Sequence, residues 1–420
     1  MPAERDELIS LIAVTDGSEE SLRALCHTAA SVFEQTYQNL ELIIARFGTE
    51  EAGEKNPAAD RLLHRICGHC EIPVRLLKRR YETRAEAENA GMEVASGEWL
   101  LFLVCGDWLN SLMAERLYFS AKWGGASLAL CGVEYELADG HIHFLRPETE
   151  LLTDCLTFLN TLFPAYYRDG LLAAGSNQLF RTALVRERRL GFRPMVSRGA
   201  EQIVFLMQYL RHCEYLSVLP AVLVTAFPAP DEVQETEPQQ EIETAFLLLE
   251  AYDALFDQLA PDDDVVNDMN NEMLDQLLRC GEHICRLERA GILSAEKSRK
   301  ALEDFSGREA FRSLLSQTSP EGFWNWAAVL LLRSGRLGLY HRLLRLRCSL
   351  DMAPWKAQQE AEEQETAAVV VQQDEAEIKT AAAAVRENEA EAQAEIEGKT
   401  KAQPLAAQKG EAACLDSEKA

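Results

Sequence analysis

The chain has 420 residues, which is enough for two or three domains, and a formal net charge of −26. This acidic balance argues against a general nucleic-acid binder, because that function needs basic surface to displace counterions. Eleven scattered cysteines, with no apparent signal peptide, favour reduced thiols and a cytoplasmic location.

The first half of the chain alternates strand-like and helix-like patterns. Apolar runs typical of buried strands lie at 8–14, 40–45, 74–77, 99–104 and 127–133. Helical spacing lies between them at 18–33, 60–67, 85–95 and 112–123. This alternation predicts an α/β fold, with a sheet covered by helices.

The second half changes character in stages. The pattern of residues 135–144, with Asp139-Gly140 at their centre, predicts a β-hairpin. Residues 151–209 have a mostly helical pattern, and residues 216–227 are predicted to form a late strand region. Helical periodicity then dominates, with one apolar stripe running from Ala245 to Leu259. The predicted organisation is an α/β domain at 1–230, a polar linker at 231–240, a helical region at 241–350 and an Ala/Glu/Gln-rich tail at 351–420. The tail, poor in large apolar residues, is expected to be disordered or a solvated helix.

Two framework motifs narrow the range of folds that fit the sequence. Gln35-Thr36-Tyr37-Gln38-Asn39-Leu40-Glu41 is followed by Asn89-Ala90-Gly91 and by Ala95-Ser96-Gly97-Glu98 ahead of a strand. These motifs closely resemble family 2 glycosyltransferases of the GT-A fold, over about residues 8–227. The resemblance implies a Rossmann-like nucleotide-diphospho-sugar transferase domain with a mainly parallel sheet. It also implies a hexosyltransferase that uses Mg²⁺ or Mn²⁺ and moves a sugar from a nucleotide-sugar donor to a glycan or lipid acceptor.

In such a fold the ligand lies beyond the carboxyl ends of the strands. The resemblance places Thr15, Asp16 and Asn89 in the nucleotide pocket, and Asn89 also keeps its family identity. Phe47 stands where the family has acids facing the base, so it either stacks on the base or covers the sheet end. Glu88 replaces a family arginine and brings an anion near the diphosphate. Four basic residues upstream either compensate or form a solvated face: Lys78, Arg79, Arg80 and Arg84.

The catalytic motifs depart from the family pattern. Val104-Cys105-Gly106-Asp107 replaces an Asp-Ser-Asp-Asp-like run, which leaves Asp107 as the one candidate metal ligand. Its alternative role is a cap on the next helix. Glu201 matches a family acid, but Gln202 occupies the position of the base, and an amide cannot take a proton. We therefore expect weak or no sugar transfer. The alternative is a non-catalytic module that binds a glycan or nucleotide sugar, or that pairs with an active glycosyltransferase.

Two further patterns are less specific. Cys67-Gly68-His69-Cys70 ends a helical run, which favours a structural role over a redox pair. A zinc set is disfavoured by the atypical spacing of its second group and by the helical pattern of both groups, which are His64, Cys67 and Cys70 with Cys280, His283 and Cys285. Residues 324–348 interleave arginines with leucines after two tryptophans, so they either contact the inner face of a membrane peripherally or pack within the chain. No apolar run reaches the roughly 20 residues of a spanning helix, which predicts a soluble protein.

Overall fold

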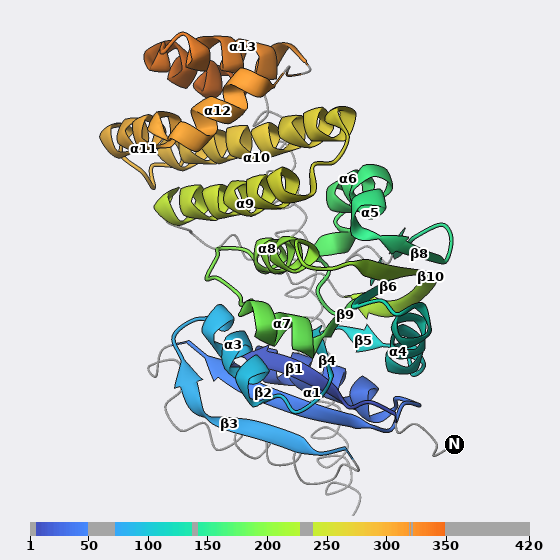
Figure 1. Ribbon diagram of the computed structural model, residues 1–420. Coiled ribbons are helices and arrows are strands. Elements are labelled where there is room, and N and C mark those ends of the chain that lie inside the picture. Colours follow the sequence, from blue (N-terminus) through green and yellow to red (C-terminus); the bar gives the residue numbers. More distant parts are fainter. Residues whose placement is uncertain are drawn as a thin grey trace, which may run out of the picture. The chain divides into compact units, whose positions relative to one another are not determined.

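A computed structural model describes residues 6–48, 72–136, 142–226, 238–318, 320 and 322–348 (Figure 1). Contacts within the chain group Met1–Arg345 into one compact unit. The tail at 351–420, most of the linker and the motif at 67–70 lie outside the described residues. Among the helices that are described, none combines the length and apolarity needed to cross a membrane.

Four parallel strands form the first half of the sheet, in the order β3 (Val74–Tyr81), β2 (Leu40–Phe47), β1 (Ile9–Thr15) and β4 (Trp99–Leu103). Ile12 in β1 pairs with Ile43 on one side and Phe102 on the other. Every residue of β1 and β4 is buried, as expected for parallel strands covered on both faces. The predicted mainly parallel α/β sheet is confirmed.

The second half of the sheet mixes directions. β9 (Gln178–Arg181) lies antiparallel between β4 and β6 (Leu128–Glu136), and β10 (Tyr215–Ala226) runs parallel to β6. Three short strands complete it: β5 (Trp108–Leu109), β7 (Ile142–Leu145) and β8 (Leu151–Asp154). The pairing of β6 with β7 confirms the two arms of the hairpin, whose turn lies outside the described residues.

The prediction that 151–209 is mostly helical is wrong at β8 and β9. Each is a four-residue strand, too short to show a period of two, and its pairing with distant strands decides its conformation.

Helices α1 (Glu19–Phe33), α3 (Arg84–Val94) and α4 (Met113–Gly124) follow the predicted helical runs. Ser18 and Thr83 cap the first two, each accepting a hydrogen bond from a backbone amide three residues on. Gly91 lets α3 approach the sheet, since a Cβ at this position would lie 2.6 Å from Cγ2 of Ile12. α3 therefore packs closely on β1 and β2, and Ala87 near its start lies in a buried cluster with Val14 and Ala45.

The connection from β8 to β10 carries α5 (Cys155–Thr161), α6 (Phe163–Arg168), the 3₁₀ turn η2 (Leu171–Ala173), α7 (Thr182–Arg188) and α8 (Arg198–Leu210). Aromatic rings join α8 to the sheet. Phe205 stacks on Phe192 with centroids 4.4 Å apart, and it meets Phe102 of β4 at 5.3 Å. These contacts hold the N-terminus of α8 at the carboxyl end of β4.

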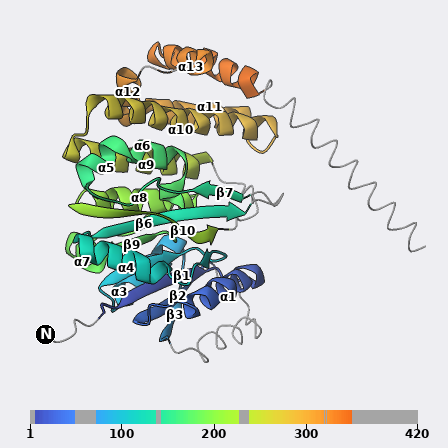
Figure 2. The ribbon, with the colours of Figure 1, turned by 90° about the vertical axis from the view of Figure 1, so that its right-hand side faces the viewer.

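The predicted helical region is confirmed. It contains α9 (Pro238–Leu259), α10 (Asp263–Arg289), α11 (Ala295–Gly307), α12 (Glu309–Gln317), α13 (Phe323–Arg333) and a last helical run at 337–348. α9 packs against α8 on one side and α10 on the other (Figure 2). Its stripe supplies the buried side chains of Leu249, Tyr252 and Leu255 to this packing.

Candidate functional site

The carboxyl ends of β1 and β2 are joined by Arg80, which reaches across from β3. Its Nε donates to the carbonyl oxygen of Phe47 at 3.0 Å, and its Nη2 donates to the carbonyl oxygen of Asp16. The turns after both strands use glycines with positive φ, Gly17 at 81° and Gly48 at 91°. Of the four basic residues, then, Arg80 belongs to the strand ends and not to a solvated face.

Thr15 and Asp16 shape the turn after β1. The Thr15 hydroxyl is fully buried, lies 2.8 Å from the Ser21 hydroxyl and accepts a hydrogen bond from the amide of Gly17. Asp16 Oδ1 accepts from the amide of Ser18 at 2.8 Å. Both side chains therefore organise the entry into α1.

Phe47 makes the covering contact that was one of its two expected roles. It packs against the buried cluster of Val14, Ala45 and Ala87, together with Tyr81. Stacking on a base remains a prediction.

Both amide atoms of the Asn89 side chain form hydrogen bonds with the loop before α8. Its Nδ2 donates to the carbonyl oxygen of Phe192 at 2.9 Å, and its Oδ1 accepts from the Phe192 amide at 2.8 Å. The nearby Gly191 is close enough that a Cβ there would lie 3.0 Å from Asn89 Oδ1. In this structure the Asn89 side chain binds the backbone of Phe192, a role that the sequence motif did not indicate.

Asp107 is buried beside Ser176, which donates to its Oδ2 at 2.6 Å and accepts from the amide of Val104. Burial raises the pKa of Asp107 to about 7, although the Ser176 hydrogen bond and the charge of Arg198 favour the ionised form. The alternative role as a helix cap is wrong. β5 intervenes, and α4 begins at Met113 with Leu112 as its N-cap.

Arg198, the first residue of α8, is a basic group whose charge acts on Asp107, and sequence reasoning missed it. Its Nη2 donates to the carbonyl oxygen of Leu103 at 2.6 Å, while its buried Nε has no hydrogen-bond partner in the described part of the chain. Its charge acts on Asp107, Glu88 and Cys105 alike. The available signal was its position three residues ahead of Glu201, which matches a family acid, at the start of a helix, where an anion is favoured.

Glu88 is 1% exposed, and its Oε2 lacks a hydrogen-bond partner among the described residues. Burial raises its pKa to about 7, with Arg198 and Arg84 opposing this shift and Glu201 adding to it. The anion expected beside the diphosphate is thus inside the protein and close to half protonated near neutrality.

Glu201 and Gln202 lie side by side in the first turn of α8, and both are buried. Glu201 accepts from Arg84 Nε at 2.8 Å and from the amide of Met195 at 3.1 Å. Neither amide atom of Gln202 finds a partner in the described ranges. A buried primary amide without partners is rare, and a ligand that offers both a donor and an acceptor would satisfy it.

The residues present do not fit the divalent ion that the resemblance implies. Val104 and Gly106 offer no ligand atoms, and the Cys105 thiol donates to the carbonyl oxygen of Val14 at 3.1 Å. Burial raises the pKa of Cys105 to about 11, so the thiol stays protonated. That leaves one carboxylate, Asp107, beside the positive charge of Arg198, which is a poor setting for a hard cation.

The structure thus places the predicted residues in two groups. Thr15, Asp16 and Phe47 lie at the ends of β1 and β2, where Arg80 links them. Asp107, Glu201 and Gln202 lie with Glu88 and Arg198 around the end of β4 and the start of α8, and Asp16 is close enough to act on the charge of Cys105. Asn89 instead supports this second group from α3.

Neither a family model nor a curated protein matches this chain. Solved structures do. S. aureus TarS 1–349 in complex with UDP-GlcNAc aligns with a TM-score of 0.57 and 15% identity, covering 81% of this chain and 92% of that one. The complex of the same TarS fragment with UDP gives 0.53 and 14%, covering 81% and 91%. The longer S. aureus TarS gives 0.50 and 14%, covering 80% of this chain and 55% of its own length. At such identities the likeness shows the fold, which is a glycosyltransferase fold of the GT-A type.

Proposed function

We propose that this chain is a family 2 glycosyltransferase-like protein that binds a nucleoside diphosphate sugar at the end of β4. Arg198, and not a divalent ion, neutralises the negative charge of the diphosphate. The observation that carries the proposal is the set of buried polar groups without partners around Asp107: Glu88 Oε2, Arg198 Nε and both amide atoms of Gln202. A ligand rich in oxygen acceptors would satisfy the two donors. The ligands named for the TarS crystals, UDP-GlcNAc and UDP, belong to this chemical class.

The electrostatics of the site support an anionic ligand. Arg198 begins a helix of 13 residues, so the partial positive charge of the helix N-terminus adds to that of its guanidinium. Glu88 opposes an anion only when it is ionised. Its pKa of about 7 lets it take up a proton as the diphosphate arrives, which removes the repulsion.

Sugar transfer by this site is slow or absent under the proposal. A base must accept the proton of the acceptor hydroxyl, and the side chain at that position is the amide of Gln202. A diphosphate leaving group also needs its developing charge neutralised, for which the site offers Arg198 and no set of metal ligands. The runner-up role is a non-catalytic module that recognises a glycan or nucleotide sugar, or that partners an active glycosyltransferase. The Gln202 amide, which has no hydrogen-bond partner among the described residues, favours ligand binding over sugar transfer under both the leading and the runner-up role.

Calorimetry with UDP and a panel of nucleotide sugars tests the proposal, with EDTA and with Mn²⁺. We expect binding in EDTA and a gain with metal below tenfold, which is about 1.4 kcal/mol. Arg198→Gln should weaken binding at least tenfold, whereas the matched change at an exposed arginine of α7, Arg188→Gln, should leave it unchanged. Metal-dependent donor hydrolysis that disappears in Asp107→Ala would overturn the proposal, because it would show a working metal site.

The proposal extends to a lipid acceptor or membrane surface through the range 324–348. α13 exposes Phe323, Trp326 and Leu330, which are 68%, 54% and 51% exposed and follow one helical stripe. Exposed Arg336 and Arg342 follow in the chain, as suits a peripheral contact with anionic lipid. Arg333 does not join them, since its guanidinium bonds the carbonyl oxygens of Leu315 and Thr318.

A further inference from the structure

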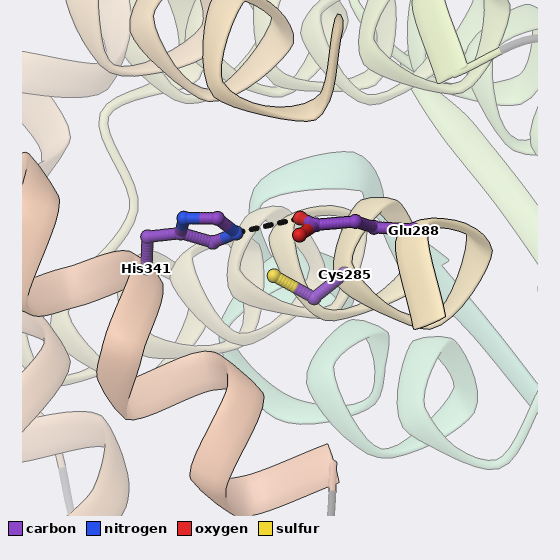
Figure 3. A group of neighbouring side chains, drawn as sticks. All are labelled: Cys285, Glu288 and His341. Carbon is purple, nitrogen blue, oxygen red and sulfur yellow. Dashed lines mark hydrogen bonds and ion pairs between the residues drawn. The ribbon is translucent and has the colours of Figure 1, made fainter. Parts of the chain in front are cut away.

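The C-terminal helices carry a separate cluster of side chains able to bind a metal. Cys285 and Glu288 lie three residues apart on α10, and His341 comes from the helical run at 337–348. One ligand atom from each residue lies within 4.8 Å of the other two. Figure 3 shows the thiol, the carboxylate and the imidazole turned toward one another.

The packing of the two helices brings these residues together. A spacing of three places Cys285 and Glu288 on one face of α10. Gly281, one turn earlier, leaves room for the neighbouring helix, because a Cβ there would lie 2.6 Å from the hydroxyl oxygen of Tyr340. His341 follows Tyr340 directly, so this close approach delivers its ring to Glu288, where Nε2 lies 2.7 Å from Oε2.

We propose that Cys285, Glu288 and His341 bind a zinc ion, with a water molecule as the fourth ligand. The donor set decides the metal. A thiolate, an imidazole and a carboxylate suit Zn²⁺, whereas Mg²⁺ and Ca²⁺ require oxygen ligands almost exclusively. Three protein ligands with one open position is also a recurrent zinc arrangement.

The charges balance when the ion enters. Cys285 gives up its thiol proton to solvent, and His341 binds as the neutral tautomer that carries its proton on Nδ1, so that Nε2 is free to bind Zn²⁺ in place of its hydrogen bond to Glu288. One thiolate and one carboxylate then neutralise the ion. Ligand atoms on a tetrahedral zinc lie about 3.3 Å apart, so the imidazole and carboxylate must separate by roughly half an ångström.

Arg345 lies beside Glu288, with Nη1 at 4.0 Å from Glu288 Oε1, and opposes a cation there. Its side chain is 58% exposed and can turn into solvent when the metal binds.

Cobalt substitution in the full chain tests the site. The wild type loaded with Co²⁺ should show a thiolate-to-cobalt charge-transfer band and the intense visible bands of four-coordinate cobalt, and Zn²⁺ should displace them. Cys285→Ser should lose the charge-transfer band, and His341→Gln should weaken Zn²⁺ binding at least tenfold. Arg345→Gln should strengthen Zn²⁺ binding several-fold, because it removes the competing cation, whereas a simple ion-pair network would gain nothing from this change.

Two controls separate this site from other thiols. Cys280→Ser removes a cysteine of the same helix that is not in the cluster, and it should keep the cobalt spectrum. Cys67→Ser with Cys70→Ser removes the other cysteine pair and should also keep it. The proposal fails if the wild type shows no charge-transfer band. It also fails if the band survives in Cys285→Ser or disappears in the variant lacking Cys67 and Cys70.

Discussion

Replacing Glu88 by glutamine should stabilise the protein at alkaline pH and have little effect at acid pH. Glu88 is 1% exposed, and burial raises its pKa from 4.5 to about 7. Between these two values the folded state holds a proton that the unfolded state has released. Wild-type stability therefore falls as pH rises through this window, and above about pH 7 the full cost of the buried charge is present.

The size of the effect follows from the shift. One pKa unit corresponds to about 1.4 kcal/mol, so the charged Glu88 costs about 3 kcal/mol near pH 8 and about 1 kcal/mol near pH 5. Glutamine has almost the same shape and no charge. Its stabilising effect should therefore be about 2 to 3 kcal/mol larger at the higher pH.

Urea denaturation followed by circular dichroism at both pH values measures this difference. Glu93→Gln is the matched control, because Glu93 lies on the same helix with an exposed side chain, and it should show no such dependence. Equal effects of Glu88→Gln at the two pH values would refute the account of Glu88 as a buried carboxyl of raised pKa.

Four other outcomes are expected. Gln202→Leu should raise the free energy of unfolding in urea by about 1 to 2 kcal/mol, because it removes unpaired polar atoms, and it should weaken UDP binding in calorimetry. A loss of stability would mean that the amide has hydrogen-bond partners. Asn89→Ala should cost about 2 kcal/mol on thermal unfolding, since two hydrogen bonds to the loop before α8 are lost, and an unchanged Tm would contradict this. Phe323→Ser combined with Trp326→Ser should abolish sedimentation with anionic vesicles at unchanged Tm; equal sedimentation would exclude α13 as the contact. Truncation after Met352 should leave Tm nearly unchanged, and a large drop would show that the tail packs on the folded part.

The sequence predicted the elements whose burial is visible in their own pattern. β1 and β4 are buried on both faces and read as continuous apolar runs, and α9 shows its stripe directly. β9 could not be predicted in this way, because four residues carry no period and its strand form depends on pairing with β4 and β6.

The sequence motifs singled out Asp107, Glu201 and Gln202 but not the charges that surround them. Asp107 follows β4, and Glu201 and Gln202 lie in the first turn of α8, while the functional roles of all three remain predictions. Arg80 turns toward the strand ends after a register shift between β2 and β3, and such an irregularity changes the direction of a side chain without a signature in a single sequence. Arg198 depends on where α8 begins, and helix boundaries are among the least certain features of a sequence.

The bond between Asn89 and the backbone of Phe192 connects segments 103 residues apart in the sequence. It fixes the loop that precedes Arg198 and Glu201 before any ligand arrives. The entropy of ordering that loop is therefore lost during folding and not again during binding. A ligand meets a pre-organised site, so weakening this bond should slow association and lower affinity even though Asn89 touches only protein.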